Sequence, residues 1–117
     1  MNLTIRVNPP SIVRIMGRQE NIDLDKEKIR AFCEVNGIQR LSLFGSVLTD
    51  RFGPESDVDV LIDFLPGSVP GFFRLAAIEA DLAQLFGRAR VDLRTPQDLS
   101  RHFRDQVLAT AEVQYAR

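Results

Sequence analysis

The stretch from Val58 to Phe64 restricts the fold more than any other part of the sequence. Apolar residues recur there at a period of two, which is the pattern of a β-strand. One face of this strand is wholly apolar, and the other is rich in aspartate. The first face holds Val58, Val60, Ile62 and Phe64, and the second holds Asp57, Asp59, Leu61 and Asp63. We therefore predict a strand with one face in the core and one face that carries acid.

The residues before this strand predict a helix followed by another strand. Lys26 to Asn36 has helical spacing, Asp25 stands where an N-cap belongs, and Gly37 supplies a left-handed stop. The helix is expected to bury Cys33, a lone cysteine that packs as a small apolar residue. Residues 38–44 then read as a strand.

Three patterns follow in the second half of the chain. Apolar residues at helical spacing predict a helix over residues 75–86, and Arg90 to Arg94 is predicted to be a strand. Thr95 and Pro96 open a last helical region. That region is expected to bury Leu99, Phe103, Val107 and Leu108. The tail, residues 112–117, is expected to be frayed.

This order of elements predicts the α/β (α+β) class, with one small mixed sheet flanked by helices. The 117 residues, 44% of them apolar and 26% charged, suit a single compact domain. We assign residues 24–117 to it. Residues 1–23 are treated as an N-terminal extension with a strand over residues 1–8 and a short helix around residues 12–16, whose role the sequence does not reveal.

Charge and hydropathy exclude several classes of protein. Lys and Arg total 15 against 16 for Asp and Glu, which argues against a nucleic-acid binder with a basic surface. No stretch approaches the roughly 20 consecutive apolar residues of a membrane span, and the N-terminus lacks the layout of a signal peptide. We therefore expect a cytoplasmic protein with no direct nucleic-acid partner and no membrane partner.

The residues that carry chemistry are Gly45 and Ser46, followed after ten residues by Asp57 and Asp59. Two carboxylates at i and i+2 on a strand share one face, with Cα atoms about 6.6 Å apart, which suits a pair of Mg²⁺ ions. Hard cations of this kind take oxygen ligands and substrate phosphates, so a nucleoside triphosphate is the natural co-ligand.

Gly45 and Ser46 are suited to the phosphate end of such a substrate. Gly45 allows close approach of the backbone, and Ser46 would stand at the start of a short helical turn with a hydroxyl and free N–H groups. Taken singly, Asp-x-Asp is also common as solvated strand polarity and Gly-Ser as a simple turn. The joint arrangement favours a nucleotide and metal site.

The run Leu43-Phe44-Gly45-Ser46, ten residues, then Asp57-Val58-Asp59 resembles the minimal nucleotidyltransferase (MNT) domain of the DNA polymerase beta superfamily. The resemblance covers about residues 24–112 and implies a polymerase-beta-like nucleotidyltransferase fold. It implies that Asp57 and Asp59 bind Mg²⁺ and that Gly45 and Ser46 hold the triphosphate. Asp92 matches the family's third acid, which makes all three aspartates the expected catalytic and metal-binding residues.

Several residues keep two interpretations. Arg51 is a candidate for binding the β- or γ-phosphate, or a solvated loop arginine. Asp92 is a catalytic acid, or it only forms ion pairs with Arg90 or Arg94. The Phe72-Phe73 pair is expected in the core more than as a nucleobase platform. His102 is expected at the surface.

The resemblance also implies a function. It points to a Mg²⁺-dependent enzyme, with two ions, that transfers AMP from ATP to a protein hydroxyl. Small MNT proteins resemble the antitoxins of HEPN–MNT toxin–antitoxin pairs, so the implied partner is a HEPN toxin in a hetero-oligomer and the implied acceptor is a tyrosine. The alternatives are an antitoxin that acts by contact alone and a nucleotidyltransferase for small molecules. The short chain leaves little room for an acceptor pocket and disfavours the last.

Overall fold

The computed structural model describes residue 22, residues 24–87 and residues 90–117. The predicted strand and short helix in the N-terminal extension lie outside these residues. The α-helices are α1 (Lys26–Val35), α2 (Phe72–Phe86) and α3 (Arg101–Thr110), and two short 3-10 helices are η3 (Gly45–Leu48) and η4 (Pro96–Asp98). The strands are β2 (Ile38–Phe44), β3 (Val58–Phe64), β4 (Val91–Arg94) and β5 (Glu112–Ala116).

The four strands form one mixed sheet in the order β4-β3-β2-β5, and the first three of them are the strands that the sequence predicts. β2 runs antiparallel to both β3 and β5, whereas β3 and β4 are parallel. The register places Asp59 between Phe44 of β2 and Asp92 of β4. Two of the predicted acids are therefore direct neighbours across adjacent strands.

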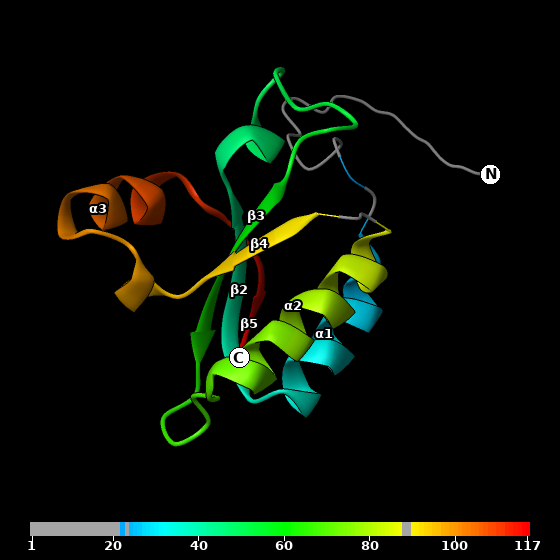
Figure 1. Cartoon of the computed structure of the whole chain (residues 1–117), viewed down its shortest axis with the longest axis vertical. Coiled ribbons are helices and arrows are strands. Elements are labelled where there is room, and N and C mark those ends of the chain that lie inside the picture. Colours follow the sequence, from blue (N-terminus) through cyan, green and yellow to red (C-terminus); the bar gives the residue numbers. More distant parts are fainter. Residues whose placement is uncertain (1–21, 23, 88–89) are drawn as a thin grey trace.

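Helices cover the two faces of the sheet unequally. Figure 1 shows α1 and α2 together on one side and α3 on the other. The side of α1 and α2 holds a continuous buried cluster to which both helices and all of the central strands contribute. The cluster on the α3 side consists of Phe44, Leu61, Leu99 and Val107. The main core therefore lies between the sheet and the helix pair.

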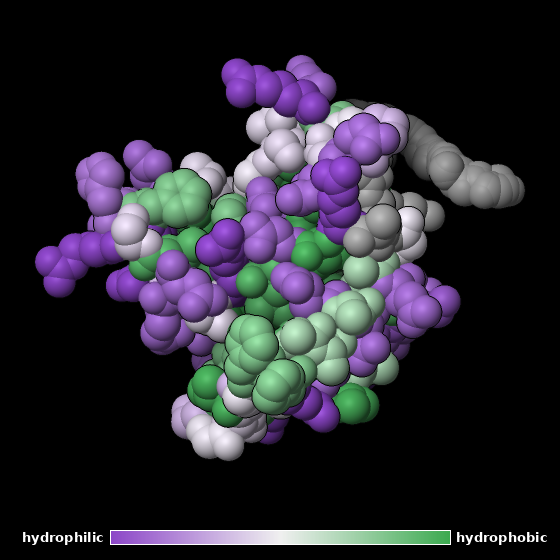
Figure 2. All heavy atoms as spheres, viewed as in Figure 1, coloured by the Kyte–Doolittle hydropathy of each residue, from purple (hydrophilic) through white to green (hydrophobic). Residues whose placement is uncertain are grey.

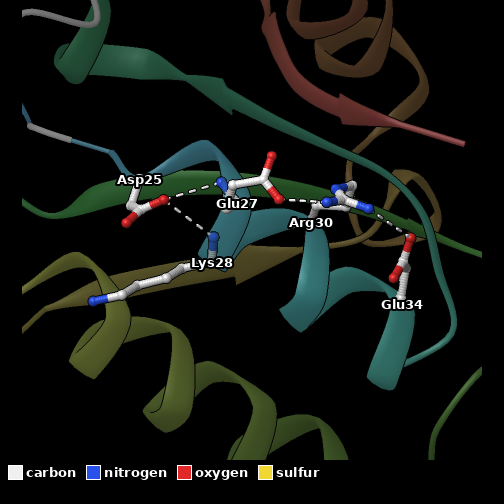
Figure 3. A network of polar contacts seen from close by, with 5 residues as sticks. All are labelled: Asp25, Glu27, Lys28, Arg30 and Glu34. Carbon is white, nitrogen blue, oxygen red and sulfur yellow. Dashed lines mark hydrogen bonds and ion pairs between the residues drawn. The ribbon is translucent and has the colours of Figure 1, made fainter.

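The start of α1 confirms the predicted cap. The Asp25 carboxylate accepts hydrogen bonds from the backbone N–H groups of Glu27 at 3.0 Å and Lys28 at 3.3 Å (Figure 3). These bonds satisfy two of the N–H groups that a helix start leaves without partners. Cys33 is buried on this helix, and burial, followed by the charge of Glu34, raises the pKa of its thiol to about 12.

The expected division of β3 into an apolar and an acidic face is only half right. Val58, Val60 and Ile62 are fully buried against α1 and α2. Leu61, on the opposite face, is buried too, because α3 and η4 pack over it. Leu61 therefore interrupts the acidic face, with Asp57 and Asp59 before it and the half-buried Asp63 after it.

The C-terminal prediction is wrong in two respects. The tail is not frayed: residues 112–116 form β5, which pairs with β2 and completes the sheet. The last helical region is split into η4 and α3, and α3 leaves Phe103 and Leu108 exposed. Val107 is the one residue of α3 that is buried, and Leu99, which follows η4, joins it in the small cluster.

The Phe72-Phe73 pair is not in the core. The two side chains are 78% and 86% exposed and form a T-shaped contact with ring centroids 5.5 Å apart. Figure 2 shows apolar groups gathered over the start of α2. His102 is exposed as expected. Within the described part of the chain, no helix has the length and apolar character needed to cross a membrane.

Candidate active site

The candidate site lies at the end of the sheet where β3 begins. Asp57 directly precedes β3, Asp59 is its second residue, and Asp92 is the register partner of Asp59 on β4. Parallel pairing of β3 and β4 aligns the two strands so that both aspartates fall on the face that α3 covers only in part. The three predicted acids are thus brought to one end of one face.

Asp59 is the central carboxylate and the most perturbed one. Its pKa is raised to about 6, first by burial and then by the negative charges of Asp92 and Asp57. The positive charge of Arg94 opposes this shift. Asp59 therefore stands among like charges, an environment that favours uptake of a proton or a cation.

The two flanking carboxylates pair with arginines. Both oxygens of Asp92 accept hydrogen bonds from Arg94, from Nε at 3.2 Å and from Nη2 at 3.3 Å. Asp57 lies 3.7 Å from Nη1 of Arg90, which also contacts Glu55. The alternative interpretation of Asp92, an ion pair with a neighbouring arginine, is thus present in this structure. The pairing of Asp92 with Arg94 in the ligand-free protein does not prevent Asp92 from contacting a metal ion or a substrate once one binds.

Gly45 links the acids to the turn that the sequence predicts to bind phosphate. Its φ of +78° lies in the left-handed region that favours glycine. A Cβ atom at this position would lie 3.2 Å from Cγ and 3.4 Å from Cβ of Asp59, and closer still to Oδ2. The carboxylate of Asp59 therefore occupies the space that any other side chain at position 45 would need.

The predicted nucleotide-binding residues share one cleft of about 720 Å³. It is lined by Gly45, Ser46, Leu48, Thr49, Arg51, Thr110 and Glu112. Its volume falls in the range of small-molecule sites. Gly45 belongs to this cleft and also touches Asp59, so the cleft and the acids meet at this glycine.

Four residues of the cleft are missing from the sequence-based site: Leu48, Thr49, Thr110 and Glu112. Thr110 ends α3, and Glu112 begins β5, the segment that was expected to be frayed. No motif marks these two residues, and the pairing of Glu112 with Leu43 of β2 brings this part of the chain to the cleft. The contact of Arg94 with Asp92, by contrast, could be predicted from the sequence, because residues at i and i+2 share one face of a strand.

The three acids have the chemistry of a magnesium site. All are carboxylates, and the absence of a side chain at Gly45 makes room for the carboxylate of the central one. In the described part of the chain, no three His, Cys, Asp or Glu side chains are gathered closely enough to hold a metal ion, and Asp57 and Asp92 instead contact Arg90 and Arg94. The three carboxylates fit Mg²⁺ in the kind of ligand that they supply, and they are the residues that would hold it.

The sequence matches known proteins along most of its length. The family described as "Nucleotidyltransferase domain" matches residues 26–113. The putative protein adenylyltransferase MJ0435 of Methanocaldococcus jannaschii is 29% identical over 91 residues, which cover 78% of this chain and 95% of that protein.

Solved structures share the fold. A structure described as a putative minimal nucleotidyltransferase is 31% identical, with a TM-score of 0.62, and covers 74% of this chain and 85% of that one. A toxin–antitoxin crystal structure with AMP-PNP is 21% identical, with a TM-score of 0.65 over 80% and 75% of the two chains. A complex of tri-AMPylated Shewanella oneidensis HEPN toxin with MNT antitoxin is 20% identical, with a TM-score of 0.58 over 86% and 73%. The fold is the expected polymerase-beta-like one.

Proposed function

The chain belongs to the nucleotidyltransferase domain family, and from that premise we propose that it transfers AMP from ATP to a tyrosine hydroxyl of a HEPN-type toxin and thereby acts as an antitoxin. The observation that carries the proposal is the contact between Gly45 and Asp59, which joins the cleft around Ser46 to the three aspartates. A substrate with phosphates in the cleft would present its α-phosphate to the acids.

Asp57 and Asp59 are the residues that would hold Mg²⁺ together with the substrate phosphates, and Asp92 would add a third carboxylate. When bound, the metal lowers the pKa of the acceptor hydroxyl and neutralises phosphate charge. The raised pKa of Asp59 supports this role, because a carboxylate crowded by like charges gains from a cation.

Asp92 is the candidate general base. The acceptor oxygen forms a bond to the α-phosphorus while the bond between that phosphorus and the bridging oxygen of the β-phosphate breaks. Pyrophosphate leaves with the electron pair, and the hydroxyl proton passes to Asp92. Asp92 is exposed enough to receive a protein side chain, with 37% of its side chain accessible.

Ser46 and Arg51 would hold the phosphates of the departing pyrophosphate. Both line the cleft that begins at Gly45, and Arg51 is exposed. A hydroxyl and a guanidinium are donors suited to phosphate oxygens, and the charge of Arg51 also opposes the negative charge that develops on the leaving group.

A protein acceptor is favoured over a small molecule by the shape of the site. The acids stand at the open end of the sheet face, and the cleft of about 720 Å³ is already of a size for the nucleotide. The proteins that share this fold include an MNT antitoxin in complex with an AMPylated HEPN toxin. The same pairing is proposed for this chain, in the cytoplasm.

The test is transfer of label from ATP that carries ³²P in its α-phosphate. The chain is incubated with Mg²⁺, labelled ATP and the purified product of the neighbouring gene as the candidate partner. We expect labelled partner protein, and loss of label when a tyrosine of the partner is changed to Phe. ATP labelled at the γ-phosphate is the control and should leave the partner unlabelled. Toxin neutralisation without any α-label would instead show an antitoxin that acts by contact alone.

A further inference from the structure

We propose that Arg94 is an exchange residue: it holds Asp92 while the site is empty of nucleotide and moves to the triphosphate when Mg²⁺ and ATP bind. This inference rests on the proposed function, because it takes Asp92 as a ligand of the metal. It assigns Arg94 two successive partners and makes it a phosphate-binding residue of the loaded site.

The first partner is fixed by the register of β4. Asp92 and Arg94 share a face of the strand, and their register partners on β3 are Asp59 and Leu61. Leu61 is a buried leucine and offers no anion, so the guanidinium of Arg94 turns back along its own strand. It engages both oxygens of Asp92, at 3.2 Å and 3.3 Å. The candidate general base is thereby occupied on both oxygens.

A guanidinium and a metal ion compete for these oxygens. A carboxylate that accepts two hydrogen bonds from one arginine has its main lone pairs engaged, so metal binding at Asp92 requires Arg94 to leave. Once a divalent cation is held by the neighbouring acids, the positive charge of Arg94 is repelled from them. Arg94 then needs a new anion, and a triphosphate is the anion that the substrate brings.

The structure makes such an exchange easy. The side chains of Arg94 and Asp92 are 46% and 37% exposed, so the pair is solvent-screened and weak compared with a buried one. Arginine presents a planar fork that matches phosphate as well as carboxylate. The charge of Arg94 also reaches Asp59, which places the arginine within electrostatic range of the central acid.

Arg90 is less suited to the same role. It lies 3.7 Å from Asp57 but also contacts the Glu55 carboxylate at 3.5 Å and donates to the Glu55 carbonyl at 3.3 Å. Glu55 would keep Arg90 in place if Asp57 turned to a metal. Among the described residues, Arg94 hydrogen-bonds to no carboxylate other than Asp92, although the charge of Asp98 also acts on it.

Arg30 supplies a matched control. It is an arginine that pairs with Glu27 and Glu34 on α1, on the opposite side of the sheet from the acids (Figures 1 and 3). It resembles Arg94 in exposure, at 55%, and in having carboxylate partners on its own element. Loss of its charge changes the net charge of the protein by the same amount without touching the site.

The experiment compares wild type, Arg94→Gln and Arg30→Gln in two titrations. The first uses Mn²⁺ alone, followed by the electron paramagnetic resonance of the free ion, and the second uses Mg²⁺ with ATP in a calorimeter. We expect Arg94→Gln to bind Mn²⁺ about threefold to tenfold more tightly, because a competitor is removed. It should bind Mg²⁺-ATP about tenfold more weakly, because a phosphate contact is lost. Arg30→Gln should change neither affinity.

The exchange predicts that Arg94→Gln changes the two affinities in opposite directions, with tighter binding of Mn²⁺ and weaker binding of Mg²⁺-ATP. A variant that loses affinity for Mn²⁺ and for ATP together, or changes neither, would overturn the role of Arg94. Arg94→Lys keeps the charge without the fork, and should place both affinities between those of wild type and Arg94→Gln. If wild type binds neither Mn²⁺ nor Mg²⁺-ATP, the proposed function fails along with this inference. Normal wild-type binding with an unchanged Arg94→Gln refutes the exchange alone.

Discussion

The two faces of the sheet are built for different purposes. The face toward α1 and α2 is packed along its whole length by a continuous apolar cluster. The face toward α3 has a cluster of only four buried residues, and beyond it stand Asp57, Asp59 and Asp92. A single well-packed face supplies most of the apolar burial that stabilises so small a domain. The other face is then free to gather like charges.

β3 displays this contrast within one strand. Val58 and Val60 are fully buried on the helix-pair side, while Asp59 between them faces the thinly covered side with a pKa raised to about 6. A charge in such surroundings opposes folding and is useful only if a ligand later neutralises it. The comparison teaches that stability and chemistry are separated by the period-two alternation of the strand.

The largest expected effect comes from removing Asp92, the proposed general base, on the thinly covered face. Asp92→Asn keeps size and shape but loses the charge and the proton acceptor, so AMP transfer should fall by about 10² to 10⁴-fold. Mg²⁺-ATP affinity should stay close to wild type, because Asp57 and Asp59 remain. Label transfer and ATP titration measure the two quantities on one preparation. Unchanged transfer would leave Asp92 as an ion-pair residue only.

The packing difference is tested by one substitution made on each face. Leu43 belongs to the large cluster and Leu61 to the small one. We expect Leu43→Ala to cost about 3 to 5 kcal/mol of unfolding free energy and Leu61→Ala about 2 to 3, because the thinner layer can collapse into the space. Urea denaturation with both variants measures this. A larger loss for Leu61→Ala would mean that the α3 face is the main source of stability.

A smaller effect of opposite sign is expected at Asp59. A carboxyl whose pKa is higher in the folded than in the unfolded chain destabilises the fold progressively as pH rises from about 4 through about 6. Asp59→Asn should therefore gain about 1 to 2 kcal/mol at pH 7, discounted for solvent screening, and gain nothing below pH 4.

Denaturation at the two pH values checks this, with Asp63→Asn as control. Asp63 is on the same face of β3 as Asp59 and lies four residues further along the strand. A gain at pH 7 that is equal in the two variants would show a general charge effect and contradict the crowding of Asp59 by its neighbours.

The smallest effect is expected at the phosphate-binding turn. Ser46→Ala removes one hydroxyl from the cleft and leaves Arg51 and the backbone donors, so ATP affinity should weaken by about 0.5 to 1.5 kcal/mol. Turnover should fall without being abolished. Calorimetry with Mg²⁺-ATP measures the change. No change at all would return Gly45 and Ser46 to the status of a turn.

The two central strands could be predicted because the apolar residues in each follow a strand pattern and because the sequence marks where each strand ends. Residues 38–44 end at Gly45, and the alternation in residues 58–64 sets the face of each side chain. β5 was not predictable, because its Val113 and Tyr115 form too short a pattern and gain their place only by pairing with β2. Burial of Leu61 depends on α3 in the same way, and no local signal announces it.

The acids and the turn of the site were predictable for a different reason: their spacing carries chemistry as well as structure. Gly45, Ser46, Asp57 and Asp59 follow a motif, and Asp92 is the one acid of its strand. Thr110 and Glu112 enter the cleft only through the missed β5. The exposure of Phe72 and Phe73 likewise follows from where α2 starts on the sheet, and an aromatic pair in a sequence does not reveal that.

The most direct test of a metal-dependent nucleotide site on the thinly covered face is a calorimetric titration with ATP. We expect wild type to bind ATP in Mg²⁺, and to lose most of that affinity both in EDTA and in the variant Asp57→Ala/Asp59→Ala. Asp63→Ala, on the same strand, should bind as wild type does. Equal ATP affinity of wild type and the double variant in Mg²⁺ would contradict the account.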